Sequence, residues 1–234
     1  MSEELELTGG WSTSSVVRVG NTGRRPSREN AAFVRDLLRH LIEVGFDSAP
    51  QYLGVDDEGR EMFGFVEGDV PENCHDAVWS DTQLEAAARL LRRFHYATTE
   101  TPLGGRGEVV CHNDFGPWNC VWKDGLPVAI IDFDRAAPGD RLDDLGYALW
   151  KFLNLGLIDL DPREQGRRFG AMIDAYGASG RGPELVAAVE RAQERMRQLV
   201  RTFPEEGRAP ALSLLRRERD WLTAHAESLA AQRP

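Results

Sequence analysis

The octet HNDFGPWN, residues 112–119, lies between two short apolar runs and constrains the fold more than any other stretch of the chain. VVC precedes it, CVW follows it, and a Lys-Asp-Gly turn then leads into a further run, PVAII. Apolar runs bounded by Asn, Asp, Gly and Pro are typical of strands, and an Asp-Gly turn between two of them is a hairpin signal. The sequence therefore predicts a buried hairpin with a polar loop at its entrance.

Three polar side chains make this hairpin a candidate site. Asp114 and Asn119 belong to the octet, and Asp132 ends the returning strand. The loop before the first strand of a hairpin and the end of the second strand lie at one edge, so we expect these side chains close together. Carboxylate and amide oxygens suit Mg²⁺. A carboxylate that does not bind the metal is free to orient a hydroxyl group and accept its proton.

The first third of the chain predicts a small sheet with one helix. Strands are expected in LELT and SSVVRV, on either side of a Gly-rich turn, and in TGRRP, which Pro26 ends. Segment 27–45 has a helical pattern, with Ser27 as a candidate cap and Gly45 after the last turn. Two further strands, joined by an Asp-Glu-Gly turn, are expected in 49–68.

Helices dominate from Asp81 onward. The first is capped by Ser80 or Asp81, and its apolar stripe includes His95, which we interpret as a core histidine with satisfied hydrogen bonds. From about Leu142 the pattern is helical to the end of the chain. The predicted fold class is α+β, with two lobes: a small antiparallel-sheet lobe in residues 1–68 and a mainly helical lobe in residues 69–234.

Composition narrows the class of protein. The formal charge of −10 argues against nucleic acid as a generic partner. The acidic N-terminus lacks an apolar signal core, and no apolar run approaches membrane-spanning length, so we expect a soluble cytoplasmic protein without a membrane partner. Three cysteines form no CxxC pair and are interpreted as buried reduced thiols. They are Cys74, Cys111 and Cys120.

Several motifs, in the same order, resemble one family. HNDFGPWN matches the H-x-D-x-x-x-x-N catalytic loop of protein-kinase-like enzymes, and IDFD matches the metal-binding motif that follows it. With the later stretch GDRLDDLGYAL, the chain looks most like the aminoglycoside phosphotransferase and choline kinase group. The resemblance implies a two-lobed protein-kinase-like fold. By motif it runs from about Leu7 to about Trp150, and the C-terminal helices match only in character.

The resemblance also implies roles for the residues of the hairpin. Asp114 would be the catalytic base that orients the acceptor hydroxyl, and Asn119 and Asp132 would hold Mg²⁺ on the phosphates of ATP or GTP. His112 would brace the loop, and Asp144 would hydrogen-bond the catalytic loop from the following helix. Asn113 stands where relatives often have glycine.

Nucleotide-binding residues are implied upstream. The segment LTGG…SSVVRV looks like the nucleotide flap, and FGFVEG resembles the hinge, whose backbone would read the purine edge. In this family the third strand normally supplies a lysine to the phosphates, but this chain has no lysine before Lys123. Arg24 or Arg25 of TGRRP must substitute for it, or Arg18 of the preceding strand. The implied cofactor-binding residues are Gly9, Gly10, Ser14, Ser15, Arg24, Arg25, Phe63 and Phe65.

The function predicted in this way is Mg²⁺-dependent transfer of the γ-phosphate of ATP or GTP to a hydroxyl of a small molecule. The acceptor would be aminoglycoside-like, an amino alcohol or a sugar. One alternative is a catalytically weak or inactive kinase-like protein that binds a nucleotide or a partner, because the lysine is missing and the flap is short. A metal-dependent hydrolase is a third reading. A polycationic acceptor would need converging carboxylates in the helical lobe, for which the candidates are Asp159, Asp161, Glu205 and Glu206.

Overall fold

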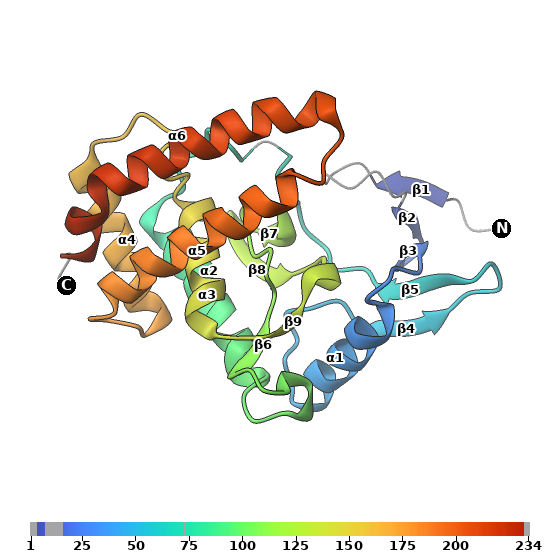
Figure 1. Cartoon of the computed structure of the whole chain (residues 1–234). Coiled ribbons are helices and arrows are strands. Elements are labelled where there is room, and N and C mark those ends of the chain that lie inside the picture. Colours follow the sequence, from blue (N-terminus) through green and yellow to red (C-terminus); the bar gives the residue numbers. More distant parts are fainter. Residues whose placement is uncertain (1–3, 8–15, 73, 232–234) are drawn as a thin grey trace.

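The computed structural model describes residues 4–7, 16–72 and 74–231. Within them, the N-terminal part is an antiparallel sheet of five strands in the order β1-β2-β3-β5-β4. Figure 1 shows this sheet at one end of the molecule, with α1 beside it and the other helices gathered at the opposite end. The strands are β1 (Glu4–Leu7), β2 (Val16–Val19), β3 (Thr22–Pro26), β4 (Tyr52–Val55) and β5 (Arg60–Gly64).

Helix α1 (Ala31–Glu43) is amphipathic and buries Leu37 and Leu41. It ends as predicted, with Gly45 at a φ of 76°, in the left-handed region that glycine adopts readily. The prediction of Ser27 as the cap is wrong, because the helix begins four residues later and the N-cap position belongs to Asn30. The Asn30 side chain does not cap the helix; it donates to the Asp134 and Ala136 carbonyls instead.

The segment after β5 runs along the predicted hairpin. Asp69 and Trp122 exchange two backbone hydrogen bonds, with N···O distances of 2.8 and 2.7 Å. Gly68 makes this approach possible, because a Cβ atom there would lie 2.5 Å from the Trp122 carbonyl oxygen. The segment that connects the sheet to the helices is therefore hydrogen-bonded to the hairpin.

Helix α2 (Asp81–Ala97) begins with a capping box in which Ser80 and Gln83 satisfy each other's backbone N–H groups. The apolar stripe that contains His95 is buried, as predicted. Helix α3 lies in the centre of the helical part, and Gly146 lets α5 approach it closely, since a Cβ would lie 2.6 Å from that of Ala188. The remaining helices are α3 (Arg141–Phe152), α4 (Pro162–Tyr176), α5 (Gly182–Val200) and α6 (Glu205–Ala230).

The predicted hairpin is present. Strands β7 (Cys120–Lys123) and β8 (Leu126–Ile130) pair antiparallel, and β6 (Val109–Cys111) pairs with β9 (Ala137–Gly139). Short 3-10 turns cover Pro102–Gly104, Pro117–Asn119 and Phe133–Arg135. The α+β class is confirmed. Among the described residues, no helix has the length and apolar character needed to cross a membrane.

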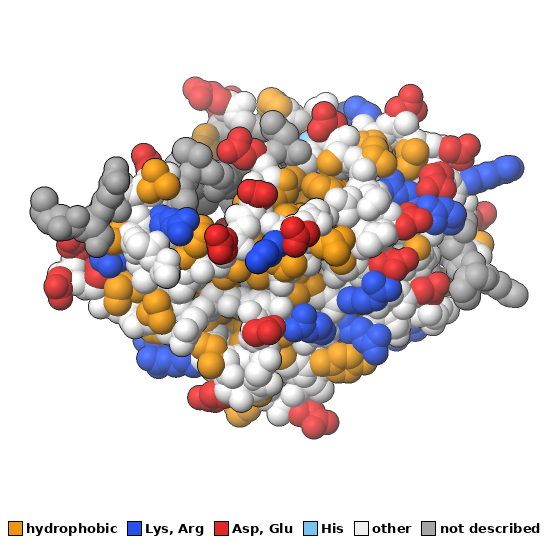
Figure 2. All heavy atoms as spheres, turned by 180° about the vertical axis from the view of Figure 1, so that it is seen from behind, with side chains coloured by type: hydrophobic (Ala, Val, Ile, Leu, Met, Phe, Trp, Pro, Cys, Tyr) orange, Lys and Arg blue, Asp and Glu red, His pale blue; other side chains and the backbone are white. Residues whose placement is uncertain are grey.

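The chain has a formal net charge of −10, but acidic side chains do not form one continuous patch on the face opposite to that of Figure 1 (Figure 2). Figure 2 shows acidic and basic side chains interspersed there, with hydrophobic side chains between them. Arginine forms many of the ion pairs on the surface, for example Arg167 with Asp81 and Glu164.

Candidate active site

The octet loop and the end of β8 meet at one edge of the hairpin, as the sequence predicted. The Ile131 N–H donates to the Asn119 carbonyl over 3.0 Å, which brings the residue before Asp132 against the end of the loop. Asn113 and Asp132 both have a φ of 61°, in the left-handed region that only Gly, Asn and Asp adopt readily. That backbone conformation explains why an asparagine or a glycine suits position 113.

Asp114 has a fixed orientation and remains accessible. Its Oδ1 accepts a hydrogen bond from the Tyr147 hydroxyl over 2.5 Å, and the Arg135 Nε lies 3.9 Å from its Oδ2. The side chain keeps 22% of its surface exposed. A carboxylate held from two sides and open on a third can accept a proton from a bound hydroxyl group.

Sequence reasoning missed both contacts of Asp114. Tyr147 lies three residues after Asp144 in α3, and this helical spacing, which places both side chains on one face, was the available signal. Arg135 directly follows the IDFD motif, and nothing in the sequence indicates that it turns back toward the loop.

Asn119 and Asp132 supply oxygen atoms of the kind that Mg²⁺ prefers. The Asn119 Nδ2 donates to the Asp114 carbonyl over 2.9 Å, so its Oδ1 is the atom left to act as a ligand. Desolvation by the surrounding protein and the neighbouring Asp134 carboxylate raise the pKa of Asp132, although Arg25 opposes the shift. Crowding of carboxylates that disfavours their ionisation is relieved by a divalent cation, so the donor set fits a hard metal ion.

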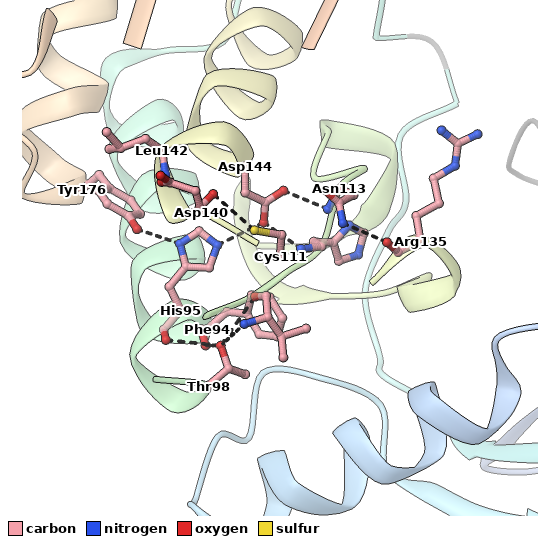
Figure 3. Close-up of polar contacts among 12 residues, drawn as sticks. Phe94, His95, Thr98, Cys111, Asn113, Arg135, Asp140, Leu142, Asp144 and Tyr176 are labelled. Atoms are coloured by element: carbon pink, nitrogen blue, oxygen red, sulfur yellow. Dashed lines mark hydrogen bonds and ion pairs between the residues drawn. The ribbon is translucent and has the colours of Figure 1, made fainter. Parts of the chain in front are cut away.

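Asp144 holds the catalytic loop in place, as the resemblance implied. It is buried, and its carboxylate accepts from the backbone N–H groups of His112, over 2.7 Å, and Asn113, over 2.8 Å. Figure 3 shows the Asp144 carboxylate between Asn113 and the ring of His95. Burial by itself would raise the pKa of Asp144, but the hydrogen bond and charge of His95 lower it below its usual value.

His95 and His112 are both buried and structural. The His95 Nε2 lies 3.0 Å from Asp144 Oδ2 and its Nδ1 lies 2.6 Å from the Tyr176 hydroxyl, which confirms a core histidine with satisfied hydrogen bonds. The His112 Nε2 lies 3.0 Å from the Ile131 carbonyl, so this ring joins the loop to the end of β8. Together with Cys111, His95 and Asp144 could group around a metal ion, but the hydrogen bonds already account for His95 and Asp144.

A cavity of about 510 Å³ opens beside Asp114. The acidic residues considered for a polycationic acceptor do not line it: Asp161 accepts from the Arg163 N–H at the start of α4, and Asp159, Glu205 and Glu206 are exposed elsewhere. Its walls come from the segment after β5, the octet loop, α3, α5 and α6. The lining residues include Asp114, Arg135, Tyr147, Lys151, Leu214 and Glu218.

Known proteins identify the family. Residues 100–183 match the phosphotransferase enzyme family. The chain is also 32% identical to the trifolitoxin immunity protein of Rhizobium leguminosarum bv. trifolii, over 99% of this chain and 99% of that protein. The chain belongs to the phosphotransferase enzyme family. The family suspected from the motifs is thereby confirmed, and with it the enzyme class of a phosphotransferase.

Solved structures confirm the two-lobed kinase-like fold. The microcompartment-associated aminopropanol kinase has a TM-score of 0.66 and 14% identity, covering 99% of this chain and 94% of that one. The GDP complex of aminoglycoside 2'-phosphotransferase-IIIa has a TM-score of 0.62 and 15% identity, with coverages of 93% and 92%. A choline/ethanolamine kinase family protein from Mesorhizobium loti has a TM-score of 0.52 and 15% identity, with coverages of 98% and 93%.

In this phosphotransferase the two candidate arginines of β3 point to different places. Arg24 binds Asp56 at the β4–β5 turn, over 3.2 Å. Arg25 binds both oxygens of Asp134, over 3.0 and 2.5 Å, and its Nη1 lies 3.8 Å from Asp132. Successive residues of a strand face opposite sides of the sheet, so of these two arginines only Arg25 is directed at the IDFD loop.

A second acidic neighbour of Arg25 comes from the sheet. Glu61 in β5 is buried and lies opposite Arg25 in the strand register, with an Nε–Oε2 distance of 3.9 Å. The pKa of Glu61 is raised because burial disfavours its charge. Asp134 is neither exposed nor free, because Arg25 occupies its carboxylate. This ion pair joins β3 directly to the IDFD loop.

The remaining nucleotide-binding predictions concern the flap and the hinge. Gly9, Gly10, Ser14 and Ser15 lie outside the described residues. Phe63 is in β5, and Phe65 follows it with its ring against the Arg18 guanidinium, 3.8 Å away. The Phe65 N–H already donates to the Asn21 carbonyl over 2.9 Å, so other backbone groups of the hinge would have to read a purine.

The three cysteines are free thiols and buried, as predicted. Burial raises the pKa of Cys74 to about 11 and the pKa values of the other two further. The burial that raises these pKa values disfavours the reactive thiolate form at neutral pH.

Proposed function

We propose that this chain transfers the γ-phosphate of ATP or GTP to a hydroxyl group of a small molecule in a Mg²⁺-dependent reaction. The observation that carries the proposal is the position of Asp114. Its carboxylate opens into the cavity, and the Mg²⁺-type donors Asn119 and Asp132 belong to the same loop edge. Two backbone N–H groups of this loop donate to the Asp144 carboxylate and hold the loop in one conformation. Phosphoryl transfer depends mainly on such positioning and on charge neutralisation.

In the proposed reaction the oxygen of the acceptor hydroxyl bonds to the γ-phosphorus, and Asp114 accepts the proton of that hydroxyl. The bond between the γ-phosphorus and the β–γ bridging oxygen breaks, and the nucleoside diphosphate leaves with the electron pair. The Tyr147 hydroxyl keeps the carboxylate pointed at the cavity. Asn119 and Asp132 would hold Mg²⁺, which neutralises the phosphate oxygens when bound.

The test is transfer of labelled γ-phosphate from ATP or GTP to a panel of amino alcohols, sugars, aminoglycosides and apolar alcohols. Asp114→Asn removes the base and keeps the size of the side chain, so turnover should fall by about a hundredfold or more. Chelation of Mg²⁺ with EDTA should abolish transfer, and added Mg²⁺ should restore it. Turnover that persists in Asp114→Asn would refute the role of Asp114 as the base.

One observation favours the alternative, a catalytically weak or inactive nucleotide- or partner-binding protein. Arg25, the substitute for the missing lysine, is already bound through two hydrogen bonds by Asp134. A guanidinium that is paired in this way has fewer N–H donors free to bind a phosphate. Thermal unfolding with Mg-ATP and Mg-GTP, combined with the transfer assay, separates the two readings. The kinase predicts a stabilising shift with at least one nucleotide together with turnover, whereas absence of both favours the alternative.

The relative named for immunity to trifolitoxin suggests a protective role. Adding a phosphate, with its negative charge and bulk, to a hydroxyl of a toxic compound would prevent that compound from binding its target. We infer that the chain acts in the cytoplasm on a foreign compound. Expression of the wild type, and not of Asp114→Asn, should then raise the resistance of a sensitive bacterium to one member of a panel of hydroxylated antibiotics.

A further inference from the structure

The cavity beside Asp114 is lined mainly by apolar side chains. They come from three places: the segment after β5, the octet loop with the turn after α3, and the facing ends of α5 and α6, whose ribbons run side by side in Figure 1. A volume of about 510 Å³ is large enough for a drug-sized molecule. The principal apolar lining residues are Val70, Trp118, Leu157, Met196, Phe203 and Leu214.

Polar side chains also line the cavity, and among them Glu218 and Lys151 form a pair within the wall. Glu218 of α6 is 1% exposed, and its Oε1 accepts from the Trp150 indole N–H over 2.9 Å and lies 3.7 Å from the Lys151 Nζ. The Glu218 Oε2 is also buried, yet within the described part of the chain it has no hydrogen-bond partner. An unsatisfied buried carboxylate oxygen is costly, so a ligand that supplies one donor there is favoured.

The pair lies at a defined place relative to Asp114. Tyr147, which binds Asp114, and Lys151, which approaches Glu218, are four residues apart in α3 and therefore lie on one face of the helix. One helical turn is about 5.4 Å long. Lys151, the α3 residue that approaches Glu218, therefore follows Tyr147, the residue that orients the base, by about one helical turn.

We infer that the acceptor is an apolar alcohol that carries a single hydrogen-bond donor at the end away from the phosphorylated hydroxyl. This inference rests on the proposed function, because it assigns the cavity to the acceptor. The hydroxyl lies at Asp114, the apolar body contacts the leucine, valine and aromatic side chains, and the donor reaches the Glu218 Oε2.

A polycationic acceptor does not suit this cavity. Its ammonium groups would have to leave water for apolar walls, which is unfavourable unless carboxylates pair with them. The carboxylates of the lining are Glu72, Asp114 and Glu218, and the last two already have Tyr147 and Trp150 as hydrogen-bond partners. Arg135 and Lys151 add positive charge to the same wall.

Binding to the nucleotide-free protein tests the inference directly. The probes are phenylalkanols of increasing chain length, the same series with a para-hydroxyl group on the ring, and streptomycin. Ligand-observed NMR measures their dissociation constants. The best para-hydroxy compound is expected to bind about tenfold more tightly than its partner without that group, because a buried acceptor gains a donor. Streptomycin is expected to bind more weakly than both.

Two variants of α6 provide the matched comparison. Leu214 lines the cavity and is 42% exposed, so Leu214→Glu introduces a charge at the wall without burying it in the core. Ser213 is its exposed neighbour and does not line the cavity, so Ser213→Glu adds the same charge outside it. Leu214→Glu should weaken binding of the phenylalkanols by about tenfold, and Ser213→Glu should change it less than about twofold.

The outcomes separate this inference from the proposed function. Tighter binding of streptomycin than of the phenylalkanols, no gain from the para-hydroxyl group, or equal effects of the two α6 variants overturns the apolar acceptor. Asp114-dependent transfer to an aminoglycoside in the same preparation would then leave the proposed kinase intact. Absence of both nucleotide binding and transfer would instead refute the kinase itself.

Discussion

Replacement of Asp144 by asparagine removes a charge and one acceptor from the group that holds the catalytic loop. In the wild type both carboxylate oxygens are used: Oδ1 by the Asn113 N–H, and Oδ2 by the His112 N–H and the His95 ring. The amide of asparagine offers one oxygen and one NH₂ group. His95 can accept a hydrogen bond from that NH₂ group by changing tautomer. A backbone N–H can only donate, so one buried N–H of the loop loses its acceptor.

The magnitude follows from this loss. An unsatisfied buried donor costs about 1–3 kcal/mol, and a charge-assisted hydrogen bond is worth about 1.5–3 kcal/mol. We therefore expect Asp144→Asn to lower the free energy of unfolding by about 3 kcal/mol, within the range of these two effects combined. For a chain of this size that corresponds to a fall in Tm of about 6–12 °C. Turnover should fall as well, because Asp114 follows the destabilised residues directly.

Asp143→Asn is the matched control, one residue away in the same helix. Asp143 pairs with Arg191 and Arg195 on the surface, where ion pairs contribute less than about 1 kcal/mol. Urea denaturation followed by circular dichroism measures both variants. If Asp144→Asn unfolds within about 1 kcal/mol of Asp143→Asn, the carboxylate does not hold the loop in the way described.

The pH dependence provides a second check on the same residue. The folded protein lowers the pKa of Asp144, so the stability that its charge contributes is present above the unfolded pKa, about 4, and is lost as the pH falls through the folded value. The wild type should therefore lose stability more steeply than Asp144→Asn below about pH 4. Parallel curves for the two proteins in acid would contradict the assignment.

Other contacts make further predictions. Tyr147→Phe removes the hydroxyl that orients Asp114, and kcat should fall about tenfold to a hundredfold, with the KM for nucleotide little changed; an unchanged kcat would exclude that role. Arg25→Lys loses the two-pronged ion pair and should raise the KM for nucleotide, whereas Arg24→Lys should not, since that side chain is bound at the β4–β5 turn. The native thiols should resist a disulfide reagent at pH 8 and react once the protein is unfolded in urea; rapid labelling of the folded protein would contradict their burial. These thiols are Cys74, Cys111 and Cys120.

Local patterns were enough to predict much of the scaffold. The hydrogen bonds that the loop donates to Asp144 were implied by the family resemblance. The hairpin, the capping box at Ser80 and the buried stripe of α2 depend on residues close in sequence. Such features follow from turn chemistry and helical periodicity, which a sequence displays directly. The failure at Ser27 is of the same local kind, because a good capping residue forms a cap only if the helix begins beside it.

Only the tertiary structure decided which groups meet across long separations. Strand alternation requires Arg24 and Arg25 to face opposite sides, but it does not say which of them faces the IDFD loop. That choice, the pairing of Arg25 with Glu61 and Asp134, and the contact of Arg135 with Asp114 depend on how the sheet is placed against the hairpin. The apolar character of the cavity has the same origin, because its walls come from segments more than a hundred residues apart, brought together by packing of the core.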